Sequence, residues 1–287
     1  MKKLFTTLFT LVAVQAFSWG LTGHRIVGHI AMDHLDPAVA DRILEVLDGE
    51  DLAMVANWMD FIKSDPAYDS LKPLHYCTIE HVDDMDNHEH PEQGDAWEAI
   101  NRYLREIETG EYSVDEAWAL RILAHLIGDV HQPLHCGNGK DRGGNDIKVT
   151  FFWKPSNLHR VWDSGMIDYW KMSYTEYSTW IMASVKQDQI AKWKEAPVKT
   201  WIEESVVYRE QCYEFDDPSK LNYKYIYDHS DMMHQRLAQA GVRLAASLNN
   251  AYAVQAADTL SLQQPIDSAA VQKVAITLPE QQPQEAQ

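Results

Sequence analysis

The chain has 287 residues, with 25 Lys and Arg against 43 Asp and Glu and a formal net charge of −18. This balance excludes a basic, sequence-reading nucleic-acid binder, because such proteins neutralise phosphates with clustered Lys and Arg. With 45% hydrophobic residues, 10 Trp and 13 Tyr, the chain is not disordered, and its length suits one large domain or two small ones. The 13 His beside an acidic excess raise the question of whether these groups are solvated or bind metal.

Residues 1–18 have the pattern of an export signal. Lys2 and Lys3 form a short positive region, an uncharged apolar stretch follows over 4–14, and Ala16-Phe17-Ser18 resembles a cleavage site with small residues. The apolar stretch is too short to span a bilayer permanently, and no other segment approaches that length. We therefore expect an exported protein, periplasmic or extracellular, whose mature chain begins at Trp19 and does not enter a membrane.

Apolar residues recur at helical spacing along most of the remaining chain. Thr22 is a suitable N-cap for the first helix, Pro37 opens the second, and a Ser-Asp-Pro break at 64–66 ends the third. Residues 81–95 carry many acidic side chains and few apolar ones, so we expect an exposed loop there. The helices predicted in this half of the chain cover 22–31, 37–48, 52–59, 95–109 and 114–131.

Pro133 stops the last of these helices, and a Gly-rich loop follows over 136–145. Alternating apolar residues at 147–151 predict a short strand, after which the pattern returns to helix. Beyond Tyr252 there is no aromatic residue, and Gln, Pro and Ala dominate, so 254–287 is expected to be a disordered tail. The prediction is one all-α domain over 19–253, mostly helical, with a short β-hairpin.

The three Cys residues are too few for a disulfide scaffold. In an oxidising compartment any two of Cys77, Cys136 and Cys212 could pair, and the sequence does not select the pair.

Two segments place a His four residues before an Asp. His125 and Asp129 lie in "AHLIGDVHQPLH", and His159 and Asp163 lie in "NLHRVWDS". Residues four apart share one face of a helix, so each pair can present an imidazole and a carboxylate to one metal ion. One such pair would equally fit a salt-bridged surface helix, but two pairs favour a metal centre.

Further candidate ligands lie beside helix ends. His135 follows the first pair, Asp60 lies in "ANWMD", and His75 lies in "PLHYC". His24 is the sixth residue of the expected mature chain. A free amine on Trp19 would titrate near pH 8, and with its own carbonyl it could chelate a metal in a five-membered ring.

Together these segments resemble a known family. "WGLTGH" directly after an export signal, "NWMD", "PLHY", "HLIGDVHQPLH", "GGN" and "NLHRVWD" are similar to motifs of the zinc-dependent single-strand nucleases and 3′-nucleotidases of the S1/P1 type. The resemblance runs in order from Trp19 to Asp163, and the helical remainder to about Tyr252 is compatible with it. It implies the mostly helical fold shared by phospholipases C and these nucleases.

Carried over by position, the resemblance implies three zinc ions in one cleft. The implied ligands are Asp60, His75, His125 and Asp129 for one ion; Trp19, His24 and the bridging Asp129 for a second; and His135, His159 and Asp163 for the third. Zinc lowers the pKa of bound water to about 7 and can stabilise both oxygens of an in-line displacement. The implied activity cuts single-stranded DNA and RNA to 5′-phosphate products, with 3′-nucleotides as further substrates and no obligate protein partner.

Asp60, Asp129 and Lys63 are the expected catalytic residues. The family usually has Arg where this chain has Lys63, and Lys binds phosphate as a point charge without the bidentate fork. Many members have Asp where this chain has Thr78, which leaves base preference and a proton relay open. Tyr76 matches a position on which the family stacks a base; an ordinary core aromatic is the equal alternative.

The other polar candidates receive simpler interpretations. Asn145 in "GGN" could contact a base, although a turn residue is slightly favoured. His131 lies on a different helix face from His125 and is expected to hydrogen-bond a ligand. Packing or surface roles are expected for His29 and His34, and solvated side chains for His81, His88, His90, His229 and His234.

Two alternative functions stay open at this point. A zinc phospholipase C shares the implied fold and an N-terminal Trp ligand, but it has a longer spacing from that Trp to the first His and a Glu at the position of Asp163. A non-catalytic zinc-binding export protein is the second alternative, which Lys63 and Thr78 keep open.

Overall fold

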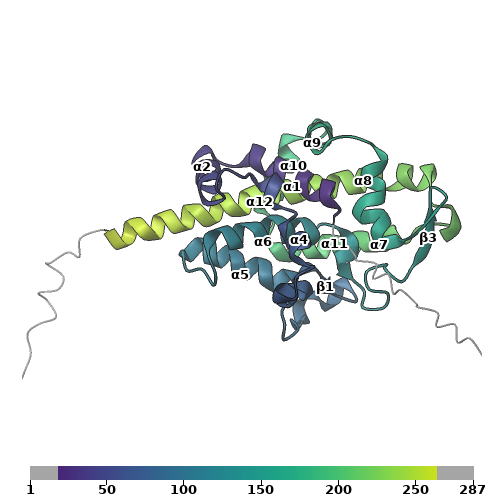
Figure 1. The fold of residues 1–287 in the computed structure, drawn as a ribbon, viewed down its shortest axis with the longest axis horizontal. Helices are drawn as coiled ribbons and strands as arrows, with labels where there is room; N and C mark the ends of the chain where they lie inside the picture. The colour runs from purple at the N-terminus through teal and green to yellow at the C-terminus, as the bar shows by residue number, and fades with distance from the viewer. Residues whose placement is uncertain (1–18, 264–287) are drawn as a thin grey trace, which may run out of the picture.

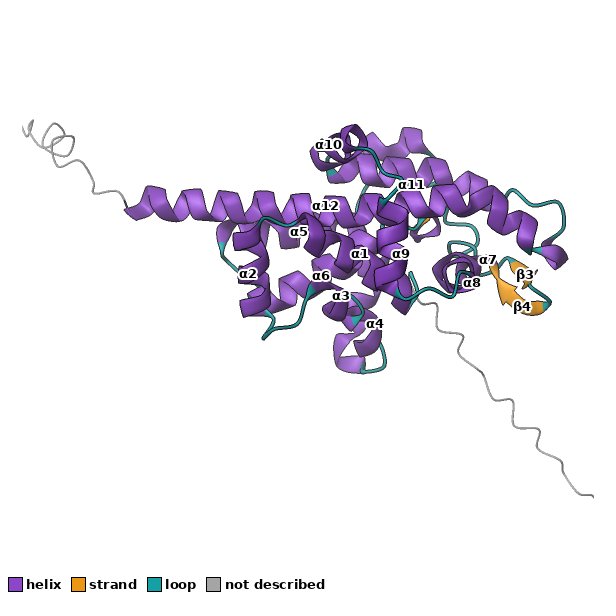
Figure 2. Cartoon of the chain, turned by 90° about the horizontal axis from the view of Figure 1, so that it is seen from above, coloured by secondary structure: helices purple, strands orange, loops and turns teal. Residues whose placement is uncertain are grey.

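The computed structural model of the chain describes residues 19–263, and the elements within that range are mostly helical (Figures 1 and 2). The predicted export signal over 1–18 and residues 264–287 of the predicted tail lie outside the described residues. The all-α prediction with a short hairpin is confirmed.

The long helix α12 (Tyr223–Gln263) runs along the molecule and packs against α1 (Leu21–His34), α5 (Ala96–Thr109) and α6 (Glu116–Asp129) (Figure 1). Its buried side chains recur every three or four residues, which gives the helix one apolar face. That face comprises Met233, Leu237, Ala240, Leu244 and Leu248. Gly241 allows α1 to cross closely, since a Cβ there would lie 2.5 Å from the Ile30 Cβ.

The end of α12 corrects one prediction. The helix continues to Gln263, so residues 254–263, predicted to belong to a disordered tail, are helical. Loss of aromatic residues does not end the helix here, because residues such as Ala and Gln sustain a helix through backbone propensity even though most side chains over 253–259 are exposed. The rest of the predicted tail lies outside the described residues.

Helix α6 places the central motif inside the protein. Asp115 caps its N-terminus by accepting a hydrogen bond from the Trp118 amide at 2.7 Å. From Ala119 to Asp129 all but one of its residues are fully buried. Because the whole second half of the helix is enclosed, His125 and Asp129 face protein on every side instead of forming a surface ion pair.

The predicted helix over 52–59 is broken in the structure. It forms α3 (Leu52–Val55) and α4 (Trp58–Ile62), with Ala56 and Asn57 between them. The break leaves the Ala56 carbonyl outside a regular helical ladder, and this oxygen accepts a hydrogen bond from His125 Nδ1 at 2.6 Å. A tertiary hydrogen bond therefore replaces a local one that periodicity had suggested.

The remaining helical elements are shorter and surround this centre. They are α2 (Pro37–Val46), α7 (Leu158–Arg160), α8 (Met166–Tyr169), α9 (Tyr174–Met182), α10 (Gln187–Glu195) and α11 (Val198–Cys212), the 3-10 segments η1 (Pro66–His75), η2 (Val82–Asn87), η3 (Pro133–His135) and η5 (Pro218–Lys220), and the π-helical turn η4 (Val161–Gly165). The exposed loop expected over 81–95 thus contains one 3-10 segment, η2.

Two small sheets complete the fold. Strands β3 (Lys148–Phe151) and β4 (Lys154–Asn157) form the antiparallel hairpin, which lies at one end of the molecule (Figure 2). Strands β1 (Cys77–Thr78) and β2 (Cys136–Gly137) pair in parallel, with Cys77 opposite Cys136. The Sγ atoms of these two free Cys lie 3.4 Å apart. The strand pairing holds the chain that follows His75 beside the chain that follows His135.

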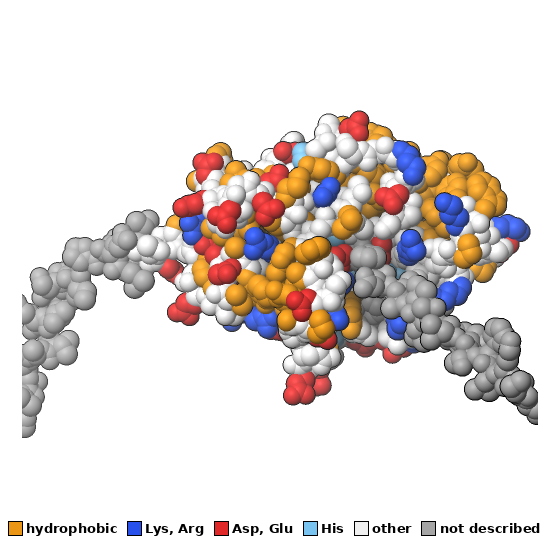
Figure 3. Space-filling model, in the orientation of Figure 1, with side chains coloured by type: hydrophobic (Ala, Val, Ile, Leu, Met, Phe, Trp, Pro, Cys, Tyr) orange, Lys and Arg blue, Asp and Glu red, His pale blue; other side chains and the backbone are white. Residues whose placement is uncertain are grey.

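The surface carries charge of both signs. On the face drawn in Figure 3, Lys and Arg side chains are separated by apolar and uncharged groups, without merging into one basic surface. Within residues 19–263, no helix combines the length and the apolar character needed to cross a membrane.

Candidate metal centre

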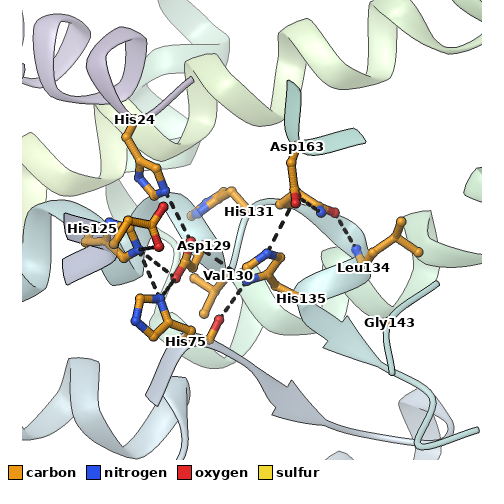
Figure 4. Close-up of polar contacts among 12 residues, drawn as sticks. His24, His75, His125, Asp129, Val130, His131, Leu134, His135, Gly143 and Asp163 are labelled. Carbon is orange, nitrogen blue, oxygen red and sulfur yellow. Dashed lines mark hydrogen bonds and ion pairs between the residues drawn. The ribbon is translucent and has the colours of Figure 1, made fainter. Parts of the chain in front are cut away.

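Eight of the predicted ligand side chains converge in the interior of the protein (Figure 4 shows most of them). Every one of them is buried. They form three groups within which the ligand atoms lie within 4.8 Å of one another: His24, Asp60 and His125; His75, His125 and Asp129; and His135, His159 and Asp163.

Asp129 belongs to the second group and also contacts His24 of the first. Its Oδ2 atom lies 2.9 Å from His75 Nδ1 and 3.2 Å from His125 Nε2, and its Oδ1 atom lies 3.4 Å from His24 Nε2. The rings of His24 and His125 stack with their centroids 3.9 Å apart. One carboxylate therefore faces three imidazoles from α1, η1 and α6, as the predicted bridging role requires.

Backbone carbonyls orient several of the imidazoles. The Nδ1 atoms of His125, His135 and His159 donate hydrogen bonds to the Ala56, His75 and Gly143 carbonyls at 2.6, 2.7 and 2.7 Å. A carbonyl can only accept, so each of these Nδ1 atoms carries a proton and each Nε2 atom faces a carboxylate. This arrangement is typical of metal-binding His.

The third group is built from η3, α7 and η4. Asp163 lies in the π-helical turn, with its Oδ2 atom 3.2 Å from His159 Nε2 and its Oδ1 atom 3.7 Å from His135 Nε2. Gln132 Nε2 donates a hydrogen bond to Asp163 Oδ1 at 2.7 Å, and its Oε1 atom accepts one from the Leu134 amide. Gln132 is a site residue absent from the predicted set, although its place inside the "DVHQPLH" motif was a usable signal.

The charges of the centre favour ionised carboxylates. Burial alone would raise the pKa of Asp60, but the neighbouring His125 and Lys63 outweigh burial and lower it to about 2. Burial also opposes ionisation of Asp129, yet its imidazole neighbours hold the pKa of that carboxyl well below its usual range. For His75, burial lowers the pKa to about 3 despite the hydrogen bond to Asp129, so this ring is neutral at pH 7.

His135 differs from His75. Burial would lower its pKa, but Asp129 and Asp163 raise it to about 9. This ring must therefore lose a proton before its Nε2 atom can bind a metal, and the metal then takes the place of the proton that faces Asp163.

These donors fit zinc. Imidazole nitrogen and carboxylate oxygen are ordinary zinc ligands, and tetrahedral ligands at zinc distances lie roughly 3.3 Å apart. The separations of 2.9 to 3.7 Å around Asp129 and Asp163 bracket this value. In addition, Asp129 Oδ1 and His135 Nε2 are buried and make no hydrogen bond within the described part of the chain. A divalent ion at each of these two positions would satisfy the atom.

Trp19 lies beside this centre and is fully buried. The amide of the next residue, Gly20, donates a hydrogen bond to the Asp163 carbonyl at 2.6 Å. Gly128 makes room on α6, since a Cβ there would lie 2.9 Å from His24 Nδ1 and 3.8 Å from Trp19 Cδ1. The structure thus brings Trp19 next to His24, while the predicted ligation through its amine and carbonyl stays a prediction.

The predicted substrate residues line one pocket of about 600 Å³ that adjoins His75, His135 and His159. Lys63 lies on its wall, with Nζ 2.6 Å from Asp60 Oδ1. Tyr76 is 51% exposed, so the core-aromatic alternative is wrong. Asn145 donates a hydrogen bond to the Arg142 carbonyl at 3.0 Å, as a turn residue does, and also lines the pocket.

Two cations of this pocket were missed by the sequence analysis. Lys72 and Arg142 line it together with Lys63, and Thr78 lies on the same wall. No local pattern marks Lys72 and Arg142 as neighbours, because they lie seventy positions apart and meet only through the β1–β2 pairing.

The remaining His residues depart from several expectations. His131 is buried, and its ring hydrogen-bonds the Ile127 carbonyl and the Arg243 guanidinium. It therefore links α6 to α12 and does not hydrogen-bond a ligand residue as expected. His229 is buried and His234 Nε2 lies 3.0 Å from the Tyr177 hydroxyl, so neither is solvated as expected. His88 is largely enclosed, with its Nε2 atom 2.9 Å from Asp95.

Comparison with known proteins supports the same conclusion as the geometry. Residues 19–253 match the profile of the S1/P1 Nuclease family. Endonuclease 2 of Arabidopsis thaliana is 28% identical over 284 residues, covering 87% of this chain and 96% of the relative. Endonuclease 5 of the same organism is 31% identical over 272 residues, covering 83% and 91%. Nuclease S1 of Aspergillus oryzae is 31% identical over 172 residues, covering 55% and 58%. The resemblance inferred from the motifs is confirmed, and the chain belongs to the S1/P1 nuclease family.

Proposed function

We propose that this protein is an exported, zinc-dependent endonuclease that hydrolyses phosphodiester bonds of single-stranded DNA and RNA and leaves 5′-phosphates. Three zinc ions and a further activity on 3′-nucleotides are part of the proposal. The observation that carries it is a buried array of His and Asp that opens onto a pocket lined by three cations and an exposed Tyr. The family match and the relatives named nucleases and endonucleases support it.

Zinc bound to this array would supply Lewis-acid charge and a nucleophile derived from water near neutral pH. Asp60 and Asp129, both ionised at pH 7, provide the negative charge that holds the ions. Lys63 reaches the pocket from beside Asp60 and can bind a phosphate oxygen as a point charge. No Ser or Cys nucleophile is required by this arrangement.

The pocket explains how an acidic protein can bind a polyanion. Lys63, Lys72 and Arg142 contribute three positive side chains around one cavity, in a chain whose formal net charge is −18. Lys72 and Arg142 are paired with Asp69 and Asp146 at 2.6 and 2.5 Å, so incoming phosphates compete with these surface ion pairs. Substrate attraction is therefore local to the site.

The exposed ring of Tyr76 supports selectivity for unpaired bases. Stacking on an aromatic face is sequence-tolerant, and it requires a base that is free of its own duplex neighbours. Because Tyr76 projects into the same pocket as the ligand residues His75 and His135, a base on its ring would lie next to the reacting phosphate.

An activity assay with metal analysis tests the proposal. The purified protein is assayed for zinc per chain and against single-stranded DNA, RNA, duplex DNA, a 3′-nucleotide and phosphatidylcholine. We expect at least three zinc ions per chain, preference for single strands over duplex, and products with 5′-phosphates. Zinc near one per chain, or lipid hydrolysis without nuclease activity, would refute it; the latter result would indicate a phospholipase C.

The terminal-amine ligand has its own test. A chain that begins at Trp19 is compared with one that carries a single additional Gly before it. The extension converts the amine into an amide, which binds zinc poorly, so we expect one zinc ion fewer and a large loss of activity. Equal zinc content and activity in both proteins would rule out the amine as a ligand, and N-terminal sequencing of the exported protein locates the cleavage point.

A further inference from the structure

We infer that His88, His90 and Asp95 form a second, separate zinc site outside the central array. Their ligand atoms lie within 4.8 Å of one another. His88 Nε2 lies 2.9 Å from Asp95 Oδ2, and His90 Nδ1 lies 3.0 Å from both oxygens of the same carboxylate. None of the three lines the substrate pocket, and none belongs to the ligand set of the central site.

A tight turn brings these side chains together. The Gly94 amide donates a hydrogen bond to the Pro91 carbonyl at 2.8 Å, and Gly94 has a φ of +80°, so the chain reverses between His90 and Asp95. Asp95 then caps α5, since its Oδ1 atom accepts a hydrogen bond from the Glu98 amide at 3.0 Å. The carboxylate is thereby fixed while both rings fold back over it.

Trp97 holds the two imidazoles in position. Its ring is stacked on the ring of His88 with centroids 5.7 Å apart, and the ring of His90 meets it edge-on at 5.4 Å. The His88 side chain is only 11% exposed, so its rotation is restricted. Such pre-organisation lowers the entropy that metal binding must overcome.

The donor set selects a transition metal over other cations. Two imidazole nitrogens and one carboxylate oxygen suit zinc, whereas calcium and magnesium prefer oxygen ligands alone. The donor separations of 2.9 and 3.0 Å are near the roughly 3.3 Å expected between tetrahedral zinc ligands. His90 is 36% exposed in its side chain, which leaves an open side for water as the fourth ligand.

Charge favours a cation at the same place. Without a metal, His88 and His90 each donate a hydrogen bond to the buried carboxylate of Asp95. A single divalent ion would take the place of both of these protons. The surrounding segment adds negative potential, which attracts cations. Its acidic residues are Asp83, Asp84, Asp86, Glu89 and Glu92, of which Asp86 is paired with Lys199.

The position of the site gives it a structural role. The amide of Ala96, directly after Asp95, donates a hydrogen bond to the Tyr76 carbonyl at 3.1 Å. Zinc bound to His88, His90 and Asp95 therefore fixes the segment that supports the backbone of Tyr76, without contacting the substrate pocket itself. This inference does not depend on the proposed nuclease activity, because the site holds metal whether or not the central array is catalytic.

Zinc counting tests the site. Wild type, a His88→Ala/His90→Ala double variant and the control His81→Ala are stripped with a chelator, equilibrated with Zn²⁺ by dialysis and analysed for bound metal. The control removes an exposed His of the same segment, whose Nε2 atom lies 3.7 Å from Glu80 Oε1. We expect the double variant to bind one zinc ion per chain fewer than wild type and the control to bind as many as wild type, whatever number the central array holds.

Equal zinc content in all three proteins would overturn the inference. A conservative variant guards against misfolding: His90→Gln keeps an amide that can donate to Asp95 but removes a strong zinc ligand. In a calorimetric titration with Zn²⁺, we expect the affinity of one site to fall by more than about tenfold. A fall of roughly tenfold is what loss of a residue that only hydrogen-bonds a ligand would cause. Unchanged affinity at every site of that folded variant would also refute it.

Discussion

Asp129 shows how far the central site depends on one side chain. Its carboxylate lies 2.9 to 3.4 Å from His24, His75 and His125. The Oδ1 atom faces His24, and the Oδ2 atom faces the other two rings. Because the residue is fully buried, its negative charge is tolerable only with positive partners around it.

Replacement of Asp129 by Asn keeps the shape but removes the charge. We expect zinc affinity to fall by at least about 100-fold, since even loss of an outer partner of a ligand costs about 10- to 100-fold. Metal analysis after dialysis checks this, with the exposed Asp33→Asn variant as the control. Full zinc content in Asp129→Asn at limiting metal would contradict the bridging role.

Lys63 tests the phosphate contact. We expect Lys63→Ala to lower kcat/KM on single-stranded DNA by about 10- to 100-fold, since hydrogen bonds to charged groups contribute about 1.5–3 kcal/mol. Lys63→Arg should retain or exceed wild-type activity, because Arg offers a bidentate fork to phosphate. Steady-state kinetics measure both variants, and a Lys63→Ala enzyme with wild-type kcat/KM would exclude Lys63 from catalysis.

The buried imidazoles predict an unusual pH profile for the metal-free protein. His75 has a pKa lowered to about 3, so its contribution to stability is complete above pH 6.5 and is lost as pH falls toward 3. His135 has a pKa raised to about 9, so its contribution is complete below pH 6.5 and is lost as pH rises toward 9. Stability should therefore peak near pH 6.5.

Thermal unfolding of chelator-treated protein across pH 4 to 9 measures this profile. With zinc bound, the proton of His135 is displaced, so the decline between pH 6.5 and 9 should disappear. The same alkaline decline with and without zinc would show that His135 does not exchange its proton for metal.

At the scale of elements, short and interrupted segments carry the site. The break between α3 and α4 supplies a carbonyl for His125, and the π-helical turn η4 positions Asp163. The Gly-rich loop before β3 supplies the Gly143 carbonyl for His159. Regular helices supply the rigid frame, and their irregular ends supply the groups that orient the ligands.

Substitution of Gly143 tests whether the loop before β3 orients His159. Gly143 has a φ of +61°, and a Cβ there would lie 2.2 Å from the Leu134 carbonyl oxygen. We expect Gly143→Ala to cost about 1–3 kcal/mol from the backbone conformation, with a further loss from the clash, and to weaken zinc binding through His159. Denaturant unfolding and metal analysis give the two values.

Gly49 provides a matched control for Gly143. It also has a positive φ, of +88°, but a Cβ there meets nothing within 4 Å. Gly49→Ala should therefore show the conformational cost alone, with zinc binding intact. Equal stability losses in the two variants would mean that the clash with Leu134 is relieved at no cost.

At the scale of the whole molecule, the metal centre joins parts of the chain that are far apart in sequence. The ligand groups come from α1, α4, η1, α6, η3, α7 and η4. Bound ions would therefore cross-link most of the fold, and the protein should be markedly less stable without them.

Metal removal tests this whole-molecule role. A site held at about 1,000 times its Kd stabilises the folded state by about 4 kcal/mol, which corresponds to a Tm change of about 8–16 °C in a chain of this size. We expect a chelator to lower Tm by that amount or more and added Zn²⁺ to restore it. Calorimetry with equal Tm values in both conditions would argue against bound zinc in the purified protein.

Local sequence patterns were sufficient to predict the helical class, the position of most helices and the candidate ligands. Helical periodicity and the four-residue spacing of His125 with Asp129 and of His159 with Asp163 are local properties, so they can be recognised without a fold. The motifs also placed the chain in its family, which the comparisons confirm.

The groups that orient those ligands depend on tertiary contacts and could not be predicted from local patterns. The pairing of Gln132 with Asp163 and the contact of Cys77 with Cys136 are not encoded in any short spacing. The break at Ala56 and the continuation of α12 to Gln263 likewise depart from local pattern. Each depends on packing between segments distant in sequence or, at the end of α12, on backbone propensity, and apolar periodicity reveals neither of these causes.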